Sequence, residues 1–186
     1  MTTTTTQTPS LTGAWTIDPA HTLVEFSGKH MMFTTVKGRF RDVRGTITID
    51  DADHARSSVE VEIDAGSLDS GVEQRDAHLK SPEFLHVEQH PTITFRSTRV
   101  EPIGARKARV RGDLTIRGTT RQVELDVTYE GLGTNPWGKQ VVGFSAKTRI
   151  NRSDFGITFN VALEAGGFLV GDRIGIQLEV QAARAE

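Results

Sequence analysis

Cysteine is absent from the 186-residue chain, and no charge of one sign dominates it. Without cysteine there is no disulfide framework, thiolate zinc site, iron–sulfur cluster or cysteine nucleophile. Lys plus Arg number 22 against 24 for Asp plus Glu, so the formal net charge is -2. General nucleic-acid binding requires a basic surface, and this balance gives no support for it. No apolar run approaches the ~20 residues of a membrane-spanning helix.

The N-terminus, MTTTTTQTPS, has neither the basic region nor the apolar region of a secretory signal peptide. We therefore expect a cytoplasmic protein. A threonine-rich stretch buries little apolar surface, so residues 1–12 are predicted to form a disordered tail. The remaining residues, 13–186, are predicted to form one domain.

Apolar and polar residues alternate in segment after segment of this domain. Val110, Leu114 and Ile116 share one face of such a segment, and charged or polar residues lie between them. A period of two means that one face is buried and the other is solvated, which is typical of antiparallel sheets. About eight such segments follow one another, a pattern that fits a β-sandwich or a closed barrel. We predict an all-β domain.

Residues 70–86 break the alternation. Val72, Arg75 and Leu79 lie at helical spacing, which predicts a short helix. Ser81 and Pro82 then resemble an N-cap followed by proline at the first helical position, so a second short helix is predicted.

Histidine and charged residues offer few sites for chemistry. His86 and His90 have the spacing of a metal pair on a helix, but Pro91 follows and no third ligand is evident, so no metal site is predicted. Arg75, Asp76 and His78 could bind a ligand together or could simply fix the helix by ion pairs. Arg152 and Asp154 pose the same choice between a ligand site and a packed polar corner.

The chain resembles the YceI-like, polyisoprenoid-binding family along most of its length. The matching stretches occur in order at residues 15–22 (WTIDPAHT), 36–40 (VKGRF), 74–85 (QRDAHLKSPEFL), 91–98 (PTITFRST), 112–120 (GDLTIRGTT) and 151–157 (NRSDFGI). The resemblance implies an eight-stranded, lipocalin-like antiparallel barrel with a long isoprenoid chain, of polyprenyl or quinone type, in its interior. An eight-stranded barrel is wide enough to be filled by side chains or to hold one ligand.

This resemblance gives the candidate residues their roles. The head group of the lipid is expected at the barrel mouth, near Arg75, Asp76, His78, His30, Arg152 and Asp154. The candidates for the tunnel lining come from the buried face of the alternating segments and from nearby aromatic residues: Val24, Phe26, Val61, Ile63, Phe84, Phe95, Leu114, Val127, Phe144, Phe155 and Ile176. No cofactor is expected besides the bound lipid. The expected partners are this lipid, a membrane that exchanges it, and a second copy of the chain in a homodimer.

Two other hypotheses stay open. The chain could be an enzyme that acts on an isoprenoid or another hydrophobic substrate through Arg75, Asp76 and His78. No Gly-x-Ser-x-Gly nucleophile motif supports this. It could also be a stress-response structural domain whose barrel is filled by its own side chains.

Overall fold

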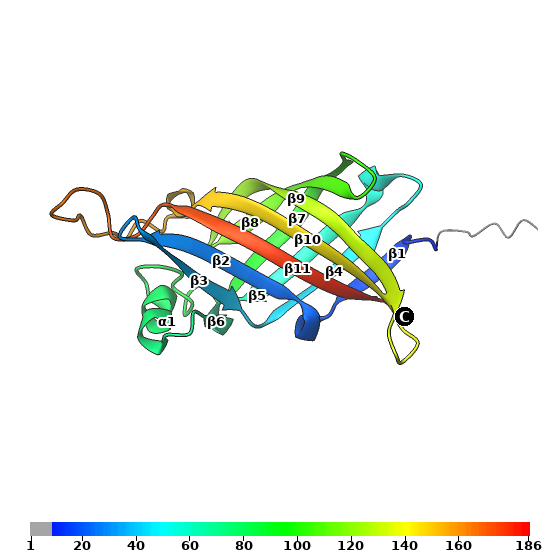
Figure 1. Cartoon of the computed structure of the whole chain (residues 1–186), viewed down its shortest axis with the longest axis horizontal. Helices are drawn as coiled ribbons and strands as arrows, with labels where there is room; N and C mark the ends of the chain where they lie inside the picture. Colours follow the sequence, from blue (N-terminus) through cyan, green and yellow to red (C-terminus); the bar gives the residue numbers. More distant parts are fainter. Residues whose placement is uncertain (1–8) are drawn as a thin grey trace, which may run out of the picture.

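The strands pair into one antiparallel sheet that closes on itself (Figure 1). The computed structural model describes residues 9–186. The strands are β1 (Gly13–Ile17), β2 (Leu23–His30), β3 (Thr34–Phe40), β4 (Val43–Ile49), β5 (Ser58–Asp64), β6 (Leu68–Asp69), β7 (Thr92–Pro102), β8 (Lys107–Ile116), β9 (Thr119–Thr134), β10 (Gln140–Asn151) and β11 (Arg173–Arg184). Each pairs with its neighbours in the order β1-β4-β5-β7-β8-β9-β10-β11, and a β1–β11 pairing completes the ring.

Three of the barrel strands bend and are each divided in two. β1 passes into β2 through the 3-10 turn η1 (Pro19–His21), and both pair with β11. β3 passes into β4 at Arg41 and Asp42, while β5 passes into β6 through η3 (Ala65–Ser67). The eleven strands therefore form an eight-stranded closed barrel, which confirms the predicted fold class.

Tight turns between neighbouring strands set the register. Ile116 pairs with Thr119 across the β8–β9 turn, so only Arg117 and Gly118 form the loop. Their φ angles are 50° and 71°, the left-handed values that a two-residue hairpin turn requires. Glycine adopts this conformation without strain, which explains the hairpin signal in the sequence.

The pleat separates charged residues on the outside from apolar residues inside. On the outer face, Arg109 and Arg111 of β8 both lie 2.8 Å from Glu124 of β9. Inside, one packed cluster contains Phe84 and Phe95, and a second contains Trp15. Buried and solvated residues thus follow the period of two that the sequence shows.

One short α-helix, α1 (Glu73–Lys80), lies beside β3 and β6 at one end of the barrel (Figure 1). The second helix predicted after Ser81 was wrong. Ser81 is the C-cap of α1, and its N–H donates to the carbonyl of His78 at 3.1 Å. Residues 82–89 then fold as turns, with His86 at a φ of 51° that no α-helix accommodates.

The first described residues are bound to the barrel rim beside η2 (His54–Arg56). Asp51 accepts hydrogen bonds from the N–H groups of Leu11 and Thr12 at 2.6 and 3.1 Å, and from the hydroxyl of Ser10 at 2.9 Å. These residues belong to the segment predicted as a tail, so the folded domain starts before residue 13. Residues 1–8 of that predicted tail lie outside the described residues. No helix within residues 9–186 is long and apolar enough to cross a membrane.

Candidate functional site

An apolar cavity occupies the inside of the barrel, because the inward side chains do not fill the space between opposite strands. Its volume is about 1310 Å³. Pockets for drug-sized molecules measure ~300–1,000 Å³, so this cavity has room for a longer ligand. The barrel is therefore hollow, which answers the question that the sequence left open between a tunnel and a filled core.

All eleven residues predicted to line a tunnel lie on the cavity wall. They come from β2, β5, β7, β8, β9, β10 and β11 and from the two turns that carry Phe84 and Phe155: Val24, Phe26, Val61, Ile63, Phe84, Phe95, Leu114, Val127, Phe144, Phe155 and Ile176. Their contact with a ligand stays a prediction.

The wall also contains residues that the sequence analysis did not name as lining. Some share strand faces with named residues and could have been found from the alternation, such as Ile116 and Leu178. Others come from irregular segments, such as Leu85, Phe159 and Val170. No periodic pattern marks these last residues, so their position follows only from the folded loops.

Two glycines make room for aromatic rings of the cavity wall. A Cβ atom on Gly38 would lie 2.3 Å from the Phe26 ring, which packs over it from the paired strand. A Cβ on Gly112 would lie 2.5 Å from the Phe95 ring. Both rings thus occupy space that a side chain would otherwise fill. The glycines keep these large residues out of the centre of the cavity.

Arg152 brings a buried positive charge to the cavity wall from η4 (Arg152–Phe155). Only 5% of its surface is exposed, and it is the one charged residue buried in the described chain. Its Nε, Nη1 and Nη2 donate to the carbonyls of Gly171, Ile157 and Val170 at 3.0, 2.9 and 3.2 Å. Burial lowers the pKa of Arg152, and the carboxylate of Asp172 opposes this effect. A guanidinium remains charged in a protein and has five N–H donors, so two are left for other acceptors.

His78 reaches the same part of the wall from α1. Its ring packs edge-on against Phe84 and Phe159, with centroids 4.9 and 5.0 Å apart. Its Nε2 lies 2.5 Å from a carboxylate oxygen of Glu83. The Arg152 guanidinium lies 6.0 Å from the centre of the Phe84 ring. Phe84 therefore lies between two polar side chains that both border the cavity.

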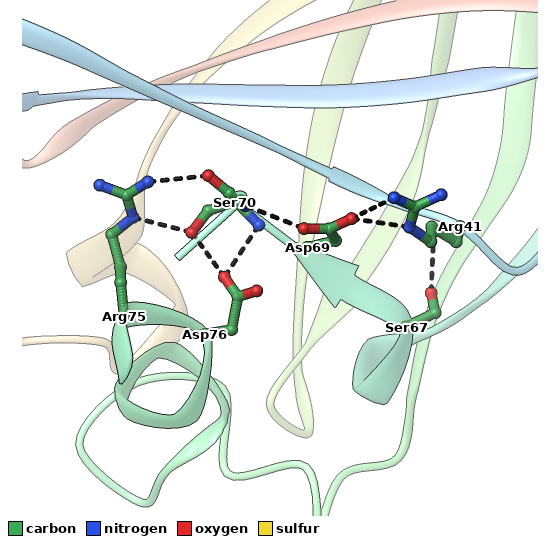
Figure 2. Close-up of polar contacts among 7 residues, drawn as sticks. Arg41, Ser67, Asp69, Ser70, Arg75 and Asp76 are labelled. Atoms are coloured by element: carbon green, nitrogen blue, oxygen red, sulfur yellow. Dashed lines mark hydrogen bonds and ion pairs between the residues drawn. The ribbon is translucent and has the colours of Figure 1, made fainter. Parts of the chain in front are cut away.

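Arg75 and Asp76 are held by Ser70 rather than by each other (Figure 2). Arg75 Nε donates to the Ser70 hydroxyl at 2.7 Å, and Arg75 Nη2 donates to the Ser70 carbonyl at 2.8 Å. Asp76 accepts from the Ser70 N–H at 2.8 Å and from its hydroxyl at 2.5 Å. Next to them, Arg41 of the β3–β4 bend forms an ion pair with Asp69. The network fixes α1 to β6 and to the barrel.

Four of the six residues predicted at the head group border the cavity, namely Arg75, His78, His30 and Arg152. His30 ends β2 and forms a backbone bridge with Val170, next to the carbonyls that Arg152 binds. Asp76 does not border the cavity, and Asp154 is exposed on the outside of η4. Within residues 9–186, no three histidine, aspartate or glutamate side chains gather as metal ligands would.

Comparisons with known proteins agree with this geometry. The model of the YceI-like domain matches residues 15–182. A UPF0312 protein of Vibrio cholerae is 39% identical over 138 residues, which cover 74% of this chain and 73% of that protein. A UPF0312 protein of Pseudomonas putida is 38% identical over 137 residues, covering 74% and 71%.

Solved structures show the same barrel. Burkholderia cenocepacia BcnA superposes with a TM-score of 0.78 at 25% identity, covering 89% of this chain and 98% of that one. The Campylobacter jejuni YCEI protein gives 0.71 at 31%, covering 85% and 90%. A polyisoprenoid binding domain from Saccharophagus degradans gives 0.67 at 11% identity, covering 92% and 98%, and shows the fold alone. With the family model matched across the whole barrel, the chain belongs to the YceI-like family.

Proposed function

We propose that this protein binds a long-chain isoprenoid lipid, of polyprenyl or quinone type, inside the barrel and carries or stores it. The observation that carries the proposal is the apolar cavity of about 1310 Å³ inside the barrel. The name of the Saccharophagus degradans neighbour, a polyisoprenoid binding domain of the same fold, supports this choice of ligand class.

Transfer of the tail out of water drives the binding. Each buried CH₂ group gains about 0.8 kcal/mol relative to water. Part of this gain is lost on ordering, and drug-sized ligands retain about 0.3 kcal/mol per non-hydrogen atom. A five-carbon isoprene unit then adds at most ~1.5 kcal/mol, or about tenfold in affinity. The apolar stretches of the wall can accept such repeats one after another.

The head group is proposed to lie near Arg152. Three of the five N–H donors of this buried guanidinium bind backbone carbonyls. The other two have no hydrogen-bond acceptor among residues 9–186. A buried donor gains when an oxygen acceptor reaches it. His78, Arg75 and His30 border the same region and would surround a quinone carbonyl or a hydroxyl.

We propose that Arg75, Asp76 and His78 do not form a catalytic group, and that of the three only Arg75 and His78 border the bound lipid. Asp76 is engaged with both donors of Ser70, and no hydrogen bond within the described chain joins it to Arg75 or His78. The three residues thus lack the mutual contacts of an acid–base group. Asp76→Ala is expected to weaken the attachment of α1 while lipid binding persists.

Native mass spectrometry of the gently purified protein tests the proposal, followed by solvent extraction of the same sample. The expected result is a complex with one extra mass, matched by a prenyl lipid in the extract. Reloading a delipidated sample with a prenyl quinone should restore the complex. The proposal fails if no lipid copurifies and the delipidated barrel also takes up neither a prenyl quinone nor a polyprenol.

A further inference from the structure

Two loops at the end of β2 expose a group of large apolar side chains. Met31, Met32 and Phe33 form the turn between β2 and β3 and are 40%, 62% and 79% exposed. Val161 and Phe168, in the loop that precedes β11, are 47% and 58% exposed. We call these five residues the apolar tip. Single exposed apolar residues are common, but a contiguous group usually marks an interaction surface.

The two loops form one unit. The N–H of Met31 donates to the carbonyl of Leu169 at 2.8 Å, and the N–H of Gly171 donates to the carbonyl of Lys29 at 2.9 Å. The sulfur of Met32 lies 2.1 Å from where a Cβ of Gly167 would be, so its side chain packs directly on that glycine. The backbone bonds hold the tip in place, and its side chains still face solvent.

The turn does not have the residues that its backbone favours. Met31 and Met32 have φ angles of 50° and 66°, in the left-handed region. Asn and Gly adopt this conformation at little expense, whereas long side chains are disfavoured there. Turn formation alone therefore does not explain two methionines at these positions. A role for their exposed side chains does.

The apolar tip is continuous with the cavity. Lys29, His30, Leu169 and Val170 adjoin the tip residues in the chain, and all four also border the cavity. Arg152, the proposed head-group ligand, donates to the carbonyl of Val170. Any lipid that leaves the cavity at this end therefore passes next to the tip.

We propose that the apolar tip inserts into the surface of a lipid bilayer and positions the cavity for lipid exchange. The inference rests on the proposed function for its purpose, but docking can be measured without any cargo. The two loops lie at one end of the barrel (Figure 1), where their exposed side chains can reach a surface that the barrel end approaches. Lys29 and Glu164 carry opposite charges beside the tip, so no cluster of one sign favours anionic lipids. Insertion is therefore driven by apolar contact.

Flotation with neutral phosphatidylcholine vesicles tests this proposal. The wild-type protein should bind, and added salt or anionic lipid should change binding by less than about twofold. The double variant Met32→Ser, Phe33→Ser should bind about a hundredfold more weakly, since each large side chain contributes roughly tenfold. Trp137→Ser is the matched control, because Trp137 is 86% exposed at the β9–β10 turn, away from the tip. This control should bind as the wild type does.

Three outcomes would overturn the proposal. The wild type could fail to bind vesicles, the double variant could bind as well as the wild type, or binding could depend on Trp137 instead. Analytical ultracentrifugation adds a further check on the oligomeric state. A wild-type dimer that becomes a monomer in the double variant would show that the apolar tip joins two copies of the chain, and would overturn the proposal. Native mass spectrometry separates a failure of membrane docking from a failure of lipid binding. If both proposals hold, the double variant should still contain its lipid but should exchange it with vesicles more slowly than the wild type does.

Discussion

Narrowing the cavity at Ala146 should shorten the longest isoprenoid that the barrel accepts. Ala146 is 9% exposed, lies on the cavity wall, and pairs with Val127 on one side and Leu178 on the other. If each non-hydrogen atom occupies about 30 Å³, the volume that one water takes in the liquid, the cavity of about 1310 Å³ holds roughly 40 carbon atoms. That corresponds to about eight isoprene units. Affinity should rise with tail length up to this point and then level off.

The Ala146→Phe variant adds about six atoms to the wall and removes roughly 180 Å³. The plateau should therefore begin one to two isoprene units earlier. At ~0.3 kcal/mol per atom, the longest ligands should lose about 2 kcal/mol, or roughly 20- to 30-fold in affinity. Ala146 precedes Arg152 by six positions, or about 20 Å along an extended strand. Ligands too short to span that distance from a head group at Arg152 should bind as they do to the wild type.

The assay is displacement of a fluorescent prenyl reporter by a series of prenyl quinones that differ only in tail length. Lys147→Phe is the matched control, because Lys147 is the next residue on β10 and points outward, where it is exposed. Circular dichroism checks that both variants stay folded. The reasoning is refuted if affinity is independent of tail length, or if the two variants shift the plateau equally.

Three further predictions concern the wall and the rim. Arg152→Met leaves three backbone carbonyls without their donor, so the free energy of unfolding should fall by about 2–4 kcal/mol, whereas Arg149→Met on the exposed face should change thermal unfolding little. Gly38→Ala forces the Phe26 ring toward the lumen, so long prenyl quinones should bind severalfold more weakly; unchanged affinity would show that the ring has other space. Burial raises the pKa of Asp51, but hydrogen bonds from Ser10, Leu11 and Thr12 outweigh it and hold the pKa below its ordinary value of 3.8. The Asp51 carboxylate therefore stabilises the fold above pH 3.8, and this contribution is lost as the pH falls through the lower pKa of the folded state. The melting temperatures of the wild type and of Asp51→Asn should converge as the pH falls through that range. A difference that stays constant with pH would contradict the role of Asp51.

The strands and their inward faces were predictable because their signal is local. Alternation alone fitted a sandwich as well as a closed barrel, and the eight-stranded barrel was predicted from the family resemblance. Alternation along β8 predicts that Val110, Leu114 and Ile116 face the inside of the sheet, and Gly118 marks the hairpin turn that follows. A strand buried on one face has to alternate in this way, whatever closes the sheet. The sequence alone therefore identifies the inward residues of each strand.

What the pattern could not give is how far the inward side chains reach. Alternation states that Phe26 and Phe95 face inward, but it does not show that Gly38 and Gly112 receive their rings and leave the centre open. Whether a barrel is hollow depends on how side chains pack across paired strands, and the alternation within one strand does not show this. The same limit applies to the loops, since nothing periodic places Phe159 or Val170 on the wall.

The polar candidates show the limit of reasoning from neighbours in sequence. Arg75 and Asp76 are adjacent on α1, and consecutive helical residues point in different directions. Arg75 borders the cavity as it binds Ser70, whereas Asp76 approaches Ser70 from outside the cavity. Likewise, Arg152 is buried and Asp154, two residues on, is exposed. Proximity in the chain identified the right segments but not the direction of each side chain.

Arg152 links the cavity, the loop and the apolar tip. A charge buried in an apolar wall is unfavourable unless its donors are satisfied, and three backbone carbonyls of residues 157–171 provide this. The same bonds fix the loop that contains Val161 and Phe168. A ligand oxygen that reached the two remaining donors would therefore contact the residue that holds the apolar tip in place. Head-group binding and the ordered conformation of the loop that contains Val161 and Phe168 would then stabilise each other, because both depend on the Arg152 guanidinium.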